Sequence, residues 1–366
     1  MENKIRTVAV SGLHRGENPQ PGASVIASLR RRFPGIRVVG LSYDPLESSL
    51  YGQSGDHPDS AYLIPYPGAG SDALFSRLQA ILEKEDIGLI IPCLDSEIEN
   101  YVEIKDRLTD HGVACVLPSI ESFNLRHKAN LHLFCQSLGV YSPRTLVAMT
   151  PAEIELHARE LGYPVYIKGR LYEAHLVDSP SELEGAYADM VRIWGWPVMV
   201  QEVIVGEEYD ITGIGDGHGN IVNSCSIRKL LRTSNGKGYG GIVVDNHELD
   251  ALAAKIISGL EWNGPFELEF LKASNKPYGL FEINPRFPAW IDFPSQIGCN
   301  LPAMLLERCL GLPVNSGGRC PAGRMFIRHS VDLVGDFSDF VAMAAKGERF
   351  LSPTTRFIEA SNDAKI

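Results

Sequence analysis

Cysteine pairs are missing from this sequence of 366 residues. The seven cysteines are scattered along the chain and none belongs to a CxxC pair, so a paired-thiol redox centre is not indicated. The ten histidines form no HExxH motif or comparable cluster, which argues against a zinc site. Scattered cysteines of this kind are typically reduced and buried, and we therefore expect a cytoplasmic protein.

Long apolar runs and an excess of positive charge are missing as well. No stretch approaches the ~18 uninterrupted apolar residues of a membrane span. The first residues, MENKIRTVAVSGL, read as a strand instead of a signal peptide. The net charge of -11 argues against nucleic acid or anionic lipid as a partner. We expect neither a nucleic-acid partner nor a membrane partner.

The hydrophobic content of 44% is that of a soluble globular protein, and the length predicts two or three domains. In the first third of the chain, apolar segments alternate with helical patterns, which predicts a parallel sheet with helices on both faces. Ligands of such sheets bind at the carboxyl ends of the strands, where Asp44 and Asp95 fall. The expected strands are residues 7–10, 36–44, 87–93 and 113–118.

The middle of the chain predicts a compact unit of helices and strands. A helical run at residues 122–138 leads into it. Thr150 and Ser179 precede two further helical patterns, and the strand YPVYIKG lies between them. Residues 201–208, QEVIVGEE, follow the unit.

Two alternating segments, FELEFL and YGLFEIN, then flank the turn-rich KASNKP. We expect them to pair as an antiparallel hairpin. Side chains two residues apart share one face of a strand, so Glu282, Asn284 and Arg286 should project together. Phe281 and Ile283 should point the other way, into a core.

The polar face of this hairpin concentrates acidic groups. Glu267 or Glu269 should lie opposite Glu282 and Asn284. Carboxylates this close repel one another unless a cation lies between them, and hard oxygen ligands suit Mg²⁺. A solvated acidic face is the alternative. Pro285 cannot donate to a ladder, so the second strand should end there or lie at a sheet edge.

Basic and acidic positions follow in a set order: Lys128, Lys168, then QEVIVGEE, FELEFL and FEINPR. In this order they resemble the ATP-grasp superfamily, which includes biotin carboxylase, carbamoyl phosphate synthetase and the pyrrolysine-pathway ligase. The resemblance spans nearly the whole chain. It implies an α/β protein with a Rossmann-like domain at 1–120, a helical linker and lid at 121–204, and an α+β catalytic body with C-terminal elements at 205–366.

The resemblance implies ATP as a cofactor and assigns residues to it. Lys128 and Lys168 would hold the phosphates, although either lysine alone is also compatible with a solvated surface charge. Glu208 would accept the ribose hydroxyls. The backbone of a short segment would bind the adenine edge, and this segment consists of Gln201, Glu202, Val203 and Ile204.

The remaining assignments concern Mg²⁺ and catalysis. Glu269, Glu282 and Asn284 would bind the metal, with Glu267 as the second choice. Arg286 would face the transferred phosphate or the acyl phosphate, and Lys168 would assist it.

One departure from the superfamily concerns the cover of the phosphates. In the superfamily, a glycine-rich loop usually follows the strand that corresponds to the one ending at Lys168. In this chain the sequence at that place is KGRLYEAHLVDSP, with a single glycine. The phosphates of ATP would then have to be covered by Arg170, by His175 or by the later segment SNGKGYGG. The alternative is that the protein binds nucleotide without turnover. SNGKGYGG lacks the spacing of a P-loop, and a closing loop and a plain connector both remain open for it.

The implied reaction joins a small-molecule carboxylate to an amine. ATP phosphorylates the carboxylate, and the amine attacks the acyl phosphate to form an amide. An amino acid or small peptide is the expected substrate, and a homodimer is the default assembly. A nucleotide-binding protein without ligase turnover and a bicarbonate-using carboxylase are the alternatives. An aromatic and basic group hints at an amino-acid-like carboxylate, or at plain core packing, and comprises Phe287, Trp290, Phe293, Arg324 and Arg328.

Overall fold

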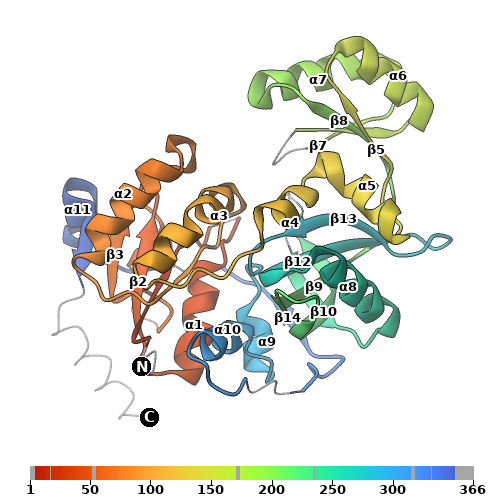
Figure 1. Ribbon diagram of the computed structural model, residues 1–366. Helices are drawn as coiled ribbons and strands as arrows, with labels where there is room; N and C mark the ends of the chain where they lie inside the picture. Colours follow the sequence, from red (N-terminus) through yellow and green to blue (C-terminus); the bar gives the residue numbers. More distant parts are fainter. Residues whose placement is uncertain are drawn as a thin grey trace.

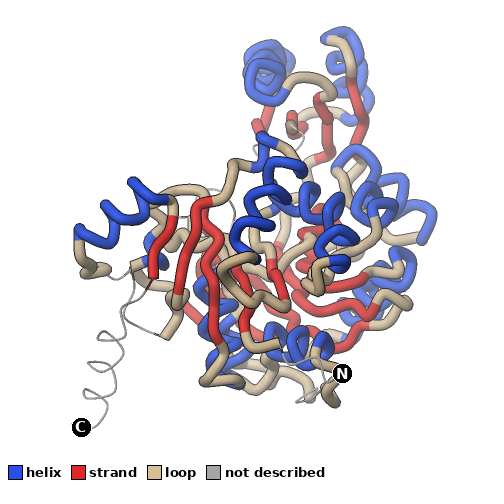
Figure 2. The backbone as a smooth tube through the Cα atoms, turned by 60° about the vertical axis from the view of Figure 1, so that its left-hand side comes forward, coloured by secondary structure: helices blue, strands red, loops and turns tan. Residues whose placement is uncertain are grey.

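The computed structural model describes residues 5–16, 18–51, 55–169, 174–233, 236, 238–314, 318–330 and 332–350. Within these residues the strands form three sheets, with helices packed against each (Figures 1 and 2). The first sheet has a parallel centre, and the other two are antiparallel. The expected mixed α/β fold is therefore confirmed.

The parallel sheet has the strand order β15-β3-β2-β1-β4. Strand β1 is buried along its whole length because helices cover both faces: Val8 and Val10 pack into one core, and Ala9 packs into another. The covering helices are α1 (Gly22–Arg32), α2 (Ser71–Leu82) and α3 (Asp95–Asp110), with short 3-10 turns at Ser48–Leu50 and Pro67–Ala69. The parallel strands are β1 (Thr7–Val10), β2 (Arg37–Ser42), β3 (Ser60–Leu63) and β4 (Leu89–Ile91).

Two local expectations are wrong in this part of the chain. Residues 113–118 form no strand, and only Ala114 makes a parallel bridge, to Leu89. The helical run at residues 122–138 is two helices, α4 (Ile120–Leu125) and α5 (Lys128–Leu138). They are separate because His127 has an extended backbone, with φ of -58° and ψ of 139°.

Residues 145–202 form the small unit, which projects from the rest of the molecule (Figure 1). Its antiparallel sheet has the order β5-β8-β6-β7. Helices α6 (Pro151–Leu161) and α7 (Pro180–Trp194) share a separate hydrophobic core with this sheet. The strands are β5 (Thr145–Ala148), β6 (Val165–Lys168), β7 (Ala174–Val177) and β8 (Val198–Glu202).

The large sheet is antiparallel and has the order β13-β12-β9-β10-β11-β14. Helices α5 and α8 (His247–Leu260) contact each other and pack against it in one core. The strands are β9 (Glu207–Asp216), β10 (Ile221–Arg232), β11 (Gly238–Val243), β12 (Asn263–Lys272), β13 (Gly279–Asn284) and β14 (Met325–Ile327).

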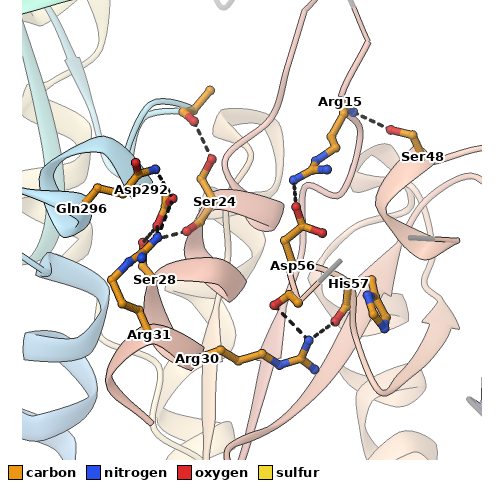
Figure 3. A network of polar contacts seen from close by, with 12 residues as sticks. Arg15, Ser24, Ser28, Arg30, Arg31, Ser48, Asp56, His57, Asp292 and Gln296 are labelled. Atoms are coloured by element: carbon orange, nitrogen blue, oxygen red, sulfur yellow. Dashed lines mark hydrogen bonds and ion pairs between the residues drawn. The ribbon is translucent and has the colours of Figure 1, made fainter. Parts of the chain in front are cut away.

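Helix α1 joins the parallel sheet to the chain segment that follows β13. Ser24 donates to the Ala289 carbonyl at 2.8 Å, and Ser28 donates to Asp292 at 3.1 Å (Figure 3). Arg31 also pairs with Asp292. These bonds hold α9 (Asp292–Gln296) against α1, and α10 (Leu301–Cys309) packs on the same helix.

The last described elements return to the parallel sheet (Figure 1). Helix α11 (Phe337–Lys346) buries Met343 in the core of the parallel sheet, and β15 (Glu348–Phe350) pairs antiparallel with β3. None of the helices in the described ranges combines the length and apolar character needed to cross a membrane.

Candidate active site

The acidic hairpin forms with the register expected from the sequence. Glu267 pairs with Asn284 and Glu269 pairs with Glu282 across β12 and β13. The Asn284 amide donates to Glu267 Oε2 at 3.1 Å and to Glu269 Oε1 at 2.8 Å. Strand β13 ends at Asn284 and lies at the sheet edge, as Pro285 predicts.

A β-bulge in this hairpin overturns the expectation for Phe281. Glu269 pairs with Glu282, but the next residue, Phe270, pairs with Leu280. Phe281 is the extra residue, so Leu280 and Ile283 enter the core while Phe281 stays half-buried. The Phe281 side chain instead lines a crevice next to Lys128 and Gln201.

Arg286 connects the hairpin to the parallel sheet. Its Nη1 donates to Glu267 Oε2 at 2.6 Å, and its Nε donates to Asp95 Oδ2 at 3.0 Å. Burial alone would lower the pKa of Arg286, but the charges of Asp95 and Glu267 raise it above its usual range. Asp95 begins α3, just beyond the carboxyl end of β4, where the sequence places a ligand-binding edge.

Lys229 lies in the middle of the acidic face, and the sequence reasoning did not identify it. Its side chain is 2% exposed, and its Nζ lies 2.6 Å from Glu269 Oε2, 3.1 Å from Asp210 Oδ1 and 3.4 Å from Glu208 Oε2. Burial opposes its charge, but the surrounding carboxylates raise its pKa well above the usual value.

The two predicted phosphate lysines come from different elements, and the charge of Glu282 acts on both. Lys128 Nζ, at the start of α5, lies 3.5 Å from Glu282 Oε1. Lys168 is the last residue of β6 in the small unit. Burial and the charge of Lys128 lower the pKa of Lys168 to about 8, while Glu282 and Glu269 oppose that shift. The lysine of the small unit therefore experiences the charges of the hairpin.

The predicted adenine segment is the connection between the small unit and the large sheet. Glu202 accepts from Lys276 Nζ at 2.5 Å and from the Arg144 backbone at 3.2 Å. The Gln201 amide donates to Thr145 at 2.8 Å within the small unit. Val203 is half-buried and Ile204 is buried.

Glu208, the second residue of β9, pairs with Arg232 and Lys229 on the large sheet. Among the candidates for covering the phosphates, His175 is half-buried on β7, opposite Ile167. Arg170 lies outside the described residues, as do positions 234, 235 and 237 of SNGKGYGG. The last residues of that segment begin strand β11.

The aromatic residues that follow Arg286 are packed against two hydrophobic cores. Phe287 is fully buried in the core, and Trp290 stacks on Phe326, with Phe293 beside it. Arg324 is exposed, whereas Arg328 is half-buried and donates to the Ala289 carbonyl. Core packing, the alternative weighed from the sequence, therefore accounts for these aromatic side chains.

A family model matches part of this chain. It describes an ATP-grasp in the biosynthetic pathway with the Ter operon, and it matches residues 196–324. That stretch contains the connection, the hairpin and Arg286.

Solved structures match most of the chain at low identity. Biotin carboxylase from Campylobacter jejuni is 18% identical, with a TM-score of 0.66 over 86% of this chain and 73% of that one. L-amino acid ligase from Bacillus licheniformis is 16% identical, with a TM-score of 0.65 over 87% and 78%. N5-carboxyaminoimidazole synthetase from Staphylococcus aureus is 16% identical, with a TM-score of 0.64 over 88% and 81%.

Residues 196–324 therefore match an ATP-grasp family model, and the similarity to the solved structures shows that this chain shares their fold. The resemblance drawn from the order of its motifs is confirmed at the level of the superfamily. The fold is that of the carboxylate–amine ligases and carboxylases of this group.

Proposed function

We propose that the protein is an ATP-dependent, ADP-forming carboxylate–amine ligase that acts through an acyl phosphate on an amino acid or small peptide. The observation that supports this best is the pairing of Glu269 with Glu282 across the hairpin, with Lys128 3.5 Å from Glu282. Opposed carboxylates can hold a metal ion, and ammonium groups beside them can bind phosphate, which suits phosphoryl transfer because this chemistry depends on positioning and charge neutralisation.

The donor set fits Mg²⁺. Glu282 and Glu269 offer carboxylate oxygens and Asn284 offers an amide oxygen, and Mg²⁺ takes its remaining ligands from water and phosphate. Glu282 is the most accessible of the three, with a side chain 31% exposed. Both oxygens of Glu269 accept bonds, from Lys229 and Asn284. When bound, Mg²⁺ neutralises the phosphate charge that develops during transfer.

The protein's own residues would perform the remaining tasks. Lys128, at the start of α5, and Lys168, in the small unit, would hold the phosphates. Arg286, oriented by Asp95 and Glu267, would face the transferred group. Backbone groups of residues 201–204 would bind adenine, and Glu208 would bind the ribose. We assign residues 121–204 to a linker and lid between the domains at 1–120 and 205–366.

Nucleotide binding tests the first half of this proposal. Ligand that binds only the folded state raises the melting temperature by mass action. We expect ATP with Mg²⁺ to raise it and GTP to raise it much less, because a backbone segment selects the base. Equal shifts with the two nucleotides would contradict the assignment of residues 201–204.

Phosphate release tests the second half. The purified protein is incubated with ATP, Mg²⁺ and pools of amino acids and dipeptides, and we expect release only with particular pools. ATP binding without release in any pool would favour a nucleotide-binding protein, and release that depends on bicarbonate would favour a carboxylase. Light scattering of the same sample tests the expected homodimer.

A further inference from the structure

Arg126 lies beside the proposed phosphate site at the break between α4 and α5. In a continuous helix, residues 126 and 128 would lie about 200° apart around the axis, on opposite faces. The break at His127 removes this restriction. As a result, Lys128 pairs with Glu282, and Arg126 also experiences the charge of Glu282.

The Arg126 guanidinium is buried without a close counter-charge. The residue is 9% exposed, and its Nε is buried and has no hydrogen-bond partner. Among the described residues, no carboxylate forms an ion pair with it within 4.0 Å. Burial lowers the pKa of Arg126, and Asp95 and Glu282 compensate only in part. A buried cation in this condition is costly unless an anion joins it.

Arg286 shows the contrast within the same region. It pairs directly with Asp95 and Glu267, so its charge is already balanced. Arg126 experiences the charges of both Asp95 and Glu282, which come from the parallel sheet side and the hairpin. Lys128, two residues further on, lies 3.5 Å from Glu282, which the proposed function assigns to the metal and the phosphates, so Arg126 projects from the chain next to that site.

We propose that Arg126 binds an oxygen of the transferred phosphoryl group, between Glu282 and Arg286. This rests on the proposed function, because it requires ATP to be oriented with its terminal phosphate toward Arg286. A guanidinium offers planar, paired N–H donors to phosphate oxygens and keeps its charge at every working pH. Stacking on Phe123, 4.2 Å from the ring centre, positions the guanidinium.

The test compares two magnesium nucleotides by calorimetry: ADP and the β,γ-imido analogue of ATP. We expect Arg126→Gln to weaken the affinity for the triphosphate analogue by at least about tenfold, while the affinity for ADP changes by less than about threefold. Arg126→Lys keeps the positive charge but lacks the paired, planar N–H donors of a guanidinium. We therefore expect a smaller loss of affinity, for the triphosphate analogue alone. Arg107→Gln is the matched control, since that exposed guanidinium also stacks on a phenylalanine ring, 3.8 Å from the centre of Phe75.

The outcomes separate this inference from the proposed function. Equal losses for both nucleotides, or no loss for either, would overturn the role of Arg126 and leave the ligase proposal standing. If Arg126→Gln fails to fold, an unchanged triphosphate affinity in Arg126→Lys would overturn it. A wild-type protein that binds neither nucleotide would overturn both proposals.

Discussion

The ammonium of Lys128 lies 3.5 Å from a carboxylate oxygen of Glu282, although the two residues come from a helix and a strand far apart in the sequence. Glu282 also faces Glu269 across the hairpin. This carboxylate is thus the point where the predicted phosphate ligands and the predicted metal ligands meet.

Glu282→Gln should reduce ADP formation by about 100-fold or more, because it removes one of the charges that position metal and phosphate. The fold should survive, since the side chain is partly exposed and its ion pair is long. Steady-state ADP release and a melting curve measure the two effects. Glu184→Gln, an exposed change on α7, is the control. Full turnover by the Glu282 variant would refute its proposed role.

The pH dependence of nucleotide binding should report on Lys168. Its pKa of about 8 in the unbound protein means that the ammonium is present below pH 8 and lost above it. Affinity for ATP should therefore fall as pH rises from 7 to 9.5, by up to about tenfold per unit above the pKa. Lys168→Arg keeps its charge over this range and should flatten the profile. Identical profiles for both proteins would exclude Lys168 as the titrating group.

The stability of the unbound protein provides a second measure of the lowered pKa of Lys168. Between about pH 8 and the ordinary lysine value of 10.5, the unfolded chain binds more protons at this residue than the folded one. The contribution of Lys168 to the free energy of unfolding should therefore rise with pH in that window. Because burial penalises the charged Lys168 at pH 7, Lys168→Met should be more stable than wild type at that pH, and urea unfolding should show that this advantage is smaller at pH 10.

Lys229→Met should lower the free energy of unfolding by about 3–5 kcal/mol, because it leaves Asp210 and Glu269 without their buried counter-charge. Adding Asp210→Leu should recover part of the loss. Lys84→Met, which breaks an exposed pair with Glu348, should cost no more than about 1 kcal/mol. Similar losses for both lysines would show that the buried network contributes little.

The connection to the small unit should be intolerant of a single methyl group at Gly206. A Cβ there would lie 2.3 Å from the Lys272 carbonyl oxygen, which is backbone and cannot rotate away. We expect Gly206→Ala to cost about 1–3 kcal/mol in urea unfolding. Gly185→Ala, where no atom lies within 4 Å on a helix, should instead be neutral or stabilising by about 0.5–1 kcal/mol. An unchanged unfolding midpoint for Gly206→Ala would show that the backbone shifts freely there.

The sequence predicts those parts of the site that depend only on the two-residue alternation of side chains along a strand. Alternation along two neighbouring strands was enough to place Glu269 opposite Glu282 beside Asn284. Phe281 was misplaced because a bulge shifts the period by one residue, and composition does not reveal a bulge. The helix break at His127 was missed because apolar residues continue on both sides of it.

Lys229 was missed for a different reason. Its partners come from β9 and β12, so its role depends on strand order, which a single sequence does not give. One local signal was available. Lys229 continues the side of β10 that carries the buried Cys225 and Ile227, and a lysine at such a position implies nearby carboxylates.

The pairing of β15 with β3 has a consequence for biosynthesis. Strand β3 is translated early, whereas the strand that covers its outer edge is among the last described residues. Domains generally fold in the order of synthesis, so the nascent parallel sheet would expose an open edge until residues 348–350 have been synthesised. Polypeptides truncated before residue 348 should therefore aggregate more readily than the whole chain, even when every residue of the candidate active site is present.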